Sequence, residues 1–103
     1  MIVRATIHRV CMTKKTISLN LSSPDIDTNT IEEVKKIKKQ SRPFNVEMGG
    51  YSQLSFEGMV VSMNVRDRFH FVLHLDKEQY WQTILKFSKI IDKFVNLRFT
   101  SEK

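Results

Sequence analysis

The chain has 103 residues, of which 41% are hydrophobic and 27% are charged, as expected for one globular domain. Seventeen lysines and arginines outnumber eleven acidic residues, and the formal net charge of +6 favours an acidic partner, most often nucleic acid. The single cysteine, Cys11, excludes an intrachain disulfide and suits a reducing compartment.

The first residues predict a strand. Val3, Ala5 and Ile7 alternate with polar side chains, which is the period of a strand with one buried face. Arg4 and its polar neighbours interrupt this segment, so we expect no signal peptide. No apolar run approaches the roughly 20 residues of a membrane span. We therefore expect a cytoplasmic protein without membrane contact, in which Cys11 is buried and inert.

A second strand and then a helix follow. Ile17, Leu19 and Leu21 alternate with polar residues, and the polar segment 13–15 makes a hairpin plausible. Thr30 and Glu33 match a capping box, so the spacing predicts a helix from there to about Gln40. Pro43 disfavours helical backbone at the residue before it. The buried face of this helix is expected to carry Ile31, Val34 and Ile37.

The middle of the chain predicts further strands. Gly49-Gly50 and Glu57-Gly58 are typical of tight turns, and the polar segment 66–68 is typical of a hairpin tip. Apolar and polar residues alternate before, between and after these turns. The expected inward residues of the last two strands are Met59, Val61, Met63, Val65, Phe69, Phe71, Leu73 and Leu75, and the expected polar outer face carries Thr16, Ser18, Asn20, His70 and His74.

A second amphipathic helix is predicted from Lys77 to about Val95. Asp76 and Gln79 form a variant of the capping box at its start. Leu97 and Phe99 allow a short last strand before a polar tail that is expected to fray from about residue 100. The apolar side of this helix is expected to carry Tyr80, Ile84, Phe87, Ile91, Phe94 and Val95, with Trp81 and Ile90 at its margin.

The element order is β-β-α-β-β-β-α, and the short links imply mainly antiparallel pairing. We predict an α+β domain over residues 1–103, with an antiparallel sheet of about five strands and two helices packed on one face. A β-α-β-β-α-β subset of this order is similar to the ferredoxin-like arrangement. That similarity is topological and implies no function.

The first predicted helix carries a dense run of positive charge. These side chains can hold the phosphates of a nucleic acid. Glu32 precedes Lys36 by four residues, which equally suits an ordinary solvated face with an ion pair. Both interpretations stay open. The run consists of Lys35, Lys36, Lys38, Lys39 and Arg42.

Two smaller basic sets could extend this footprint. Arg66 and Arg68 lie at the predicted hairpin tip, where they could enter a groove or grip an acidic surface, although Asp67 could neutralise one of them. The second predicted helix carries one stripe of three lysines, Lys86, Lys89 and Lys93. This stripe could also be the ordinary solvent-exposed face of an amphipathic helix.

We find no signature of catalysis. The sequence contains no G-x-S-x-G motif, and Gly49-Gly50 lacks the context of a phosphate-binding loop. His70 and His74 are four residues apart on a strand, about 13 Å, which is too far for both to bind one metal ion. We therefore expect a non-enzymatic protein without metal or cofactor.

The leading hypothesis is a small binding module that contacts DNA or RNA through the basic residues named above. The alternative is a phage or mobile-element protein that binds and inhibits a host protein through an acidic surface, with nucleic-acid-processing enzymes as natural targets. A single alanine and three glycines suggest an AT-rich source. A third possibility is self-association through an edge strand at residues 3–10.

Overall fold

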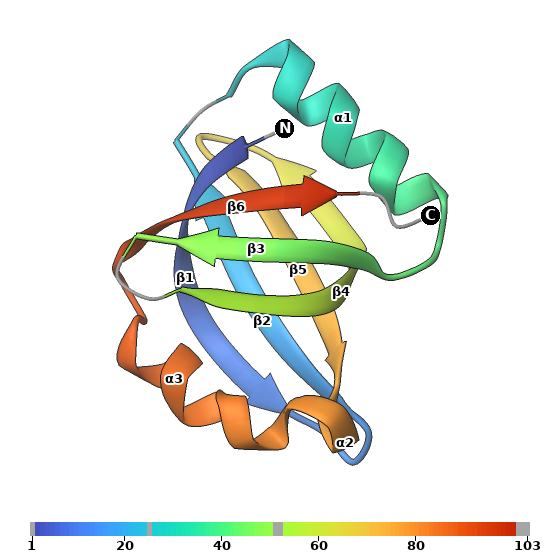
Figure 1. Ribbon diagram of the computed structural model, residues 1–103. Helices are drawn as coiled ribbons and strands as arrows, with labels where there is room; N and C mark the ends of the chain where they lie inside the picture. The colour runs from blue at the N-terminus through green and yellow to red at the C-terminus, as the bar shows by residue number, and fades with distance from the viewer. Residues whose placement is uncertain (1, 25, 51–52, 101–103) are drawn as a thin grey trace.

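The computed structural model describes residues 2–24, 26–50 and 53–100 (Figure 1). Six strands alternate with two helical regions, and the second helical region consists of two short helices joined by a 3₁₀ turn. The elements are β1 (Ile2–Met12), β2 (Thr16–Ser23), α1 (Thr28–Lys39), β3 (Phe44–Gly49), β4 (Leu54–Val65), β5 (Phe69–Asp76), α2 (Lys77–Tyr80), η1 (Trp81–Thr83), α3 (Ile84–Lys89) and β6 (Phe94–Thr100).

The strands form a closed antiparallel barrel in the order β1-β2-β5-β4-β3-β6, and β6 pairs with β1 to complete it. The predicted α+β class and antiparallel pairing are confirmed, but the sheet has six strands in a closed barrel and not about five strands in a layer under two helices. The last strand that Leu97 and Phe99 allowed is present as β6, in which Val95, Leu97 and Phe99 point into the core. Leu97 pairs with Val3 of β1, and Phe99 pairs with Val46 of β3, so the last strand closes the sheet.

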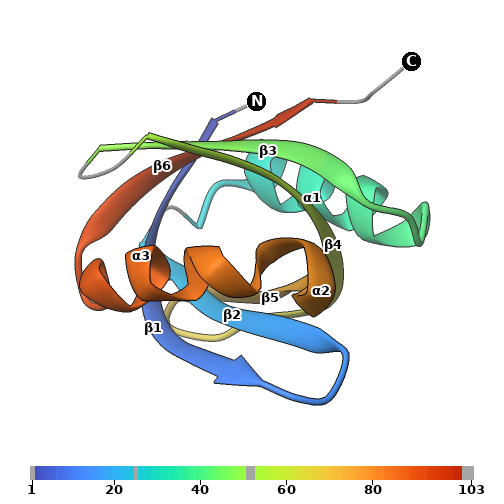
Figure 2. The same cartoon turned by 60° about the horizontal axis from the view of Figure 1, so that its bottom comes forward.

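The helices lie at opposite ends of the barrel, and not together on one face as predicted (Figures 1 and 2). A closed sheet has no free inner face for helices to cover, so apolar helix stripes instead cover its open ends. Val34 and Ile37 of α1 are buried at one end. Phe87 of α3 is buried at the other, where its ring meets Phe56 edge-on at a centroid distance of 5.4 Å.

Strand β4 is continuous, so the predicted turn at Glu57-Gly58 is wrong. Gly58 lies inside this strand and is buried. Without a turn there, the alternation that buries Phe56 and Gly58 continues to Val60, so Val60 is buried and Met59 is half-exposed, contrary to the predicted set of inward residues. A bulge between Val60 and Ser62 then adds one residue and shifts the side-chain phase beyond it.

The predicted helix from Lys77 to Val95 is shorter and broken. It starts as expected, because Asp76 Oδ2 accepts a hydrogen bond from the Gln79 N–H at 3.2 Å. It ends at Lys89, and Val95 belongs to β6. Trp81, expected at the margin of the apolar side, is 56% exposed. Among the described residues, no helix has the length and apolar character needed to cross a membrane.

Strand β1 also carries a bulge, between Ile7 and Arg9. After the bulge Cys11 pairs with Ser18 on the outer face, so the thiol is half-exposed and the predicted burial is wrong. β1 has β2 on one side and β6 on the other, so it is not an edge strand, and the predicted self-association loses its structural basis. The tail was predicted to fray from about residue 100; Thr100 ends β6, and residues 101–103 lie outside the described residues.

Candidate nucleic-acid interface

Helix α1 begins one turn earlier than the capping box at Thr30 predicts. Asp27 is the N-cap, and its carboxylate accepts hydrogen bonds from the backbone N–H and the hydroxyl of Thr30, each at 3.2 Å. Val34 and Ile37 are the buried residues of the helix, and α1 lies against β4. This packing fixes which side of the helix faces solvent.

The solvent side of α1 carries four exposed lysines. Lys36 Nζ lies 3.7 Å from Glu33 Oε1, so its ion pair is with Glu33 and not with the expected Glu32. Both side chains of this pair are exposed, and an exposed pair contributes at most about 1 kcal/mol. Basic residues in the last turn also interact favourably with the negative end of the helix dipole, which gives them a structural role independent of any ligand.

Arg42 continues the positive charge beyond the helix. Its guanidinium lies 4.4 Å from the centroid of the Phe44 ring, and its Nε donates to Gln40 Oε1 at 3.1 Å. Phe44 is itself buried, so this stacking holds the arginine close to the barrel wall. We call this cluster the α1 basic surface; it consists of Lys35, Lys36, Lys38, Lys39 and Arg42.

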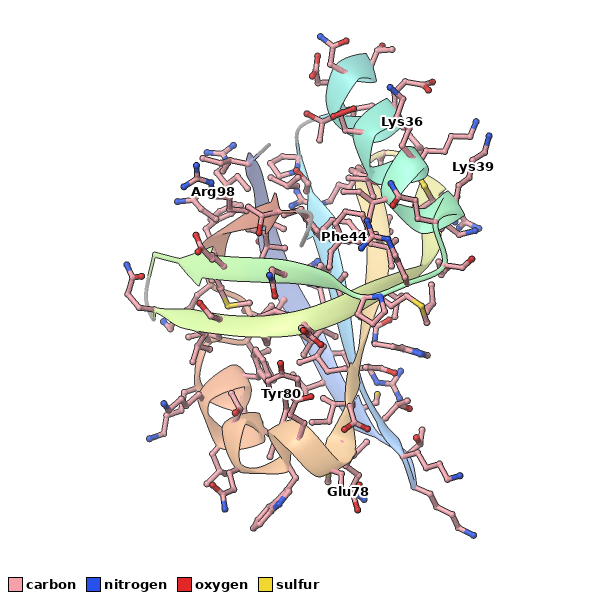
Figure 3. The ribbon with its side chains drawn as sticks, turned by 45° about the vertical axis from the view of Figure 1, so that its right-hand side comes forward. Lys36, Lys39, Phe44, Glu78, Tyr80 and Arg98 are labelled. Atoms are coloured by element: carbon pink, nitrogen blue, oxygen red, sulfur yellow. The ribbon has the colours of Figure 1, made fainter. Side chains whose placement is uncertain are left out.

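The second lysine set lies far from the α1 basic surface. Lys86 and Lys89 belong to α3 and Lys93 follows it; all three are exposed. Figures 1 and 2 place α1 and α3 at opposite ends of the barrel, and Figure 3 shows Lys36 and Lys39 at the end opposite Glu78. The two predicted sets therefore do not form one continuous footprint.

The two arginines of the β4–β5 turn differ in environment. Arg66 is exposed, whereas Arg68 is half-buried and donates from Nε to Ser22 Oγ at 3.0 Å. His8 Nε2 also contacts Ser22 Oγ, and His8 Nδ1 lies 3.9 Å from Asp92 Oδ1. Arg68 therefore joins two strands of the barrel, which leaves Arg66 as the better candidate for contacting a partner.

One line of contacts runs from Asp92 through His8 to Ser22. This is the acid, base and hydroxyl nucleophile order of a catalytic triad. Ser22 is 0% exposed, however, and its oxygen already contacts both Arg68 and His8. The 3.9 Å between His8 and Asp92 is too long for a hydrogen bond. These contacts fit a structural network on the barrel wall, because a nucleophile needs access to its substrate.

A pocket of about 600 Å³ lies at the α2 end of the barrel, where sequence analysis predicted no site. The tip of the β1–β2 hairpin meets the start of α2 there, and the Lys77 N–H donates to the Lys15 carbonyl oxygen at 3.0 Å. The pairing of β2 with β5 places Thr16 opposite Asp76, so residues distant in sequence become neighbours. The lining residues are Lys14, Lys15, Asp76, Lys77, Glu78 and Trp81.

His70 and His74 lie on the outer face of β5, half-buried, as the alternation predicts. His70 pairs with Ser22 and Asn64, and His74 pairs with Ser18 and Met59. Within the described ranges, no three His, Cys, Asp or Glu side chains gather as metal ligands. Comparisons with protein-family models, with curated proteins and with solved structures find no match to this chain.

Proposed function

We propose that this protein is a non-catalytic module that binds nucleic acid, with the α1 basic surface holding the phosphates. The observation that carries the proposal is the exposure of four lysines within two turns of one helix, continued by Arg42. Lysine and arginine groups that neutralise phosphates release condensed counterions, which drives association with nucleic acid of any sequence.

The anchoring of α1 supports this assignment. Val34 and Ile37 are buried against the barrel while the lysines are exposed, so the charged groups are carried by a helix whose orientation is fixed. The Lys36–Glu33 pair is exposed and weak, so a phosphate can replace the glutamate at little cost. If all the basic groups of this surface contact duplex phosphates, the slope of log K against log salt is about −4.5.

The other basic residues predicted from the sequence contribute less to the proposed interface. Lys86, Lys89 and Lys93 lie at the opposite end of the barrel, so they cannot contact the same short stretch of duplex as α1. Arg68 is engaged by Ser22. We therefore confine the main footprint to the α1 basic surface.

Two triple variants with the same change in net charge test the proposal. Lys35→Glu, Lys36→Glu and Lys39→Glu are combined in one protein, and Lys86→Glu, Lys89→Glu and Lys93→Glu in the other. Binding to a labelled duplex is then measured across a salt series. We expect the α1 variant to lose at least about tenfold more affinity than the α3 variant, because only α1 contacts phosphates.

Equal losses in the two variants would show that binding follows net charge and not the α1 basic surface. An unmodified protein that binds no duplex at physiological salt would also overturn the proposal. Circular dichroism of both variants establishes that the substituted proteins remain folded.

A second candidate function is binding to a protein, including the inhibition of a host protein by a phage or mobile-element protein. The observation in its favour is Trp81 and Leu85, which are four residues apart and 56% and 70% exposed. Exposed large apolar side chains close together are typical of interaction surfaces. A partner captured after nuclease treatment and lost in a Leu85→Asp variant would support this function in place of nucleic-acid binding.

A further inference from the structure

We infer that the pocket between the β1–β2 hairpin and α2 is a binding site for single-stranded nucleic acid. One unstacked base would stack on Trp81, and the adjoining phosphates would meet Lys14, Lys15 and Lys77. This inference rests on the ligand class of the proposed function but uses a different surface, at the other end of the barrel. The two can therefore fail separately.

The pocket has the volume of a ligand site. Its volume of about 600 Å³ lies within the range of about 300–1,000 Å³ that small-molecule sites occupy. Its wall comes from the hairpin and from α2, which the backbone hydrogen bond from Lys77 to Lys15 holds together at 3.0 Å. The hairpin itself is closed by the Thr13 N–H, which donates to the Thr16 carbonyl oxygen at 2.9 Å.

Trp81 supplies the stacking surface. It is the single tryptophan of the chain, and it lines the pocket while remaining 56% exposed. Tryptophan is enriched at interfaces, where its ring supplies a large apolar contact area. Stacking of one base on an aromatic side chain improves binding by about 5- to 150-fold, and it requires a base that is not already stacked in a duplex.

The charges of the pocket favour a strand over a compact polyanion. Three lysines face two carboxylates, so the lining carries a small excess of positive charge. The Asp76 carboxylate is engaged in capping α2. Glu78, labelled in Figure 3, is exposed. A triphosphate would bring several negative charges close to Glu78, whereas a strand spaces single phosphates between its nucleosides.

Intrinsic fluorescence tests this site directly, because all tryptophan emission comes from Trp81. The probe is pentathymidylate, which is compared with an abasic pentamer carrying the same phosphates and with pentaglutamate. We expect saturable quenching by pentathymidylate and little response to either control, because only the first carries bases. An equal response to the abasic pentamer or to pentaglutamate would overturn the inference.

Variants locate the site by polarisation of fluorescein-labelled pentathymidylate. We expect Trp81→Leu to weaken binding by about fivefold or more, and a combined Lys14→Gln, Lys15→Gln variant to weaken it and to reduce its salt dependence. Leu85→Ala is the matched control, because Leu85 is exposed on the same helical region but does not line the pocket. Equal effects of Trp81→Leu and Leu85→Ala would contradict a stacking role.

The α1 triple variant separates this inference from the proposed function. If it loses duplex binding while Trp81→Leu leaves pentathymidylate binding intact, the proposed function stands and the pocket assignment fails. If the α1 variant keeps duplex binding while Trp81→Leu loses pentathymidylate, the pocket stands and the α1 assignment fails.

Discussion

Arg68 donates from Nε to the hydroxyl oxygen of Ser22 at 3.0 Å, which joins the start of β5 to the end of β2. Ser22 is completely buried, so the arginine is part of the barrel wall although it adjoins an exposed turn. Its neighbour in that turn, Arg66, is exposed. Two arginines that are equivalent in sequence pattern therefore have different roles.

We expect Arg68→Ala to lower the free energy of unfolding by about 1–2 kcal/mol, because a hydrogen bond from a charged donor to a buried oxygen is lost. His8 still contacts Ser22, which limits the loss. Arg66→Ala should change stability by no more than about 0.5 kcal/mol, as exposed substitutions generally do. Urea unfolding of both variants measures the difference, and equal midpoints would show that the Arg68 contact adds no stability.

The turn after β3 depends on a glycine. Gly50 has a φ of 115°, and an added Cβ would lie 3.3 Å from the Phe94 carbonyl oxygen. We expect Gly50→Ala to destabilise the protein by about 1–3 kcal/mol, because both the backbone conformation and the space disfavour a side chain. Thermal unfolding monitored by circular dichroism measures this cost.

Gly49 is the matched control for Gly50. A Cβ there would approach only Gln53 Nε2, at 4.0 Å. We expect Gly49→Ala to change stability by less than about 1 kcal/mol. A Gly50→Ala variant as stable as Gly49→Ala would contradict the requirement for glycine at this turn.

The short helix α3 is held on the barrel by Phe87. A helix of six residues is not stable alone, so its position depends on packing. Phe87 is fully buried, and we expect Phe87→Ala to cost about 3–5 kcal/mol of unfolding free energy. Leu85→Ala, on the exposed side of the same helix, should cost no more than about 0.5 kcal/mol in the same denaturation experiment. Similar costs for the two variants would mean that α3 is not anchored through Phe87.

Neutralising a single lysine provides a finer test of phosphate contact than charge reversal. We expect Lys39→Gln to make the slope of log K against log salt less negative by about 0.9 for a duplex, because one phosphate contact is lost. Lys89→Gln, at the other end of the barrel, should leave the slope unchanged. Salt titrations of duplex binding by both variants make the comparison, and a shallower slope in Lys89→Gln alone would move the contact to α3.

Local patterns predicted the strands, except for the continuity of β4, and the start of the second helical region. The alternation through Ile17, Leu19 and Leu21 gave β2, and Asp76 caps α2 through Gln79 as its spacing indicates. The bulges in β1 and β4 were not predicted, because a single extra residue leaves no mark in the local pattern, and the bulge in β1 turns Cys11 to the outer face. Met59 was misplaced for another reason, because β4 runs through Gly58 without the expected turn.

The features that the sequence did not predict depend on contacts between residues that are far apart in the chain. The pairing of Val3 with Leu97 closes the sheet, and no local pattern records that the first and last strands meet. The positions of the candidate sites also depend on such contacts between distant residues. The lysines of α1 and α3 appear as two similar clusters in the sequence, and only closure of the barrel sends them to opposite ends. The pocket beside Trp81 depends on the register that places Thr16 opposite Asp76.

The pairing of β6 with both β1 and β3 also determines when this domain can fold during synthesis. β6 is the last strand of the barrel to leave the ribosome, and until it emerges β1 and β3 each lack a neighbour. The growing chain therefore presents two unpaired strand edges, which are sites for aggregation and for chaperone binding. Val95, Leu97 and Phe99 of the core belong to β6, so the core is complete only after β6 has been translated.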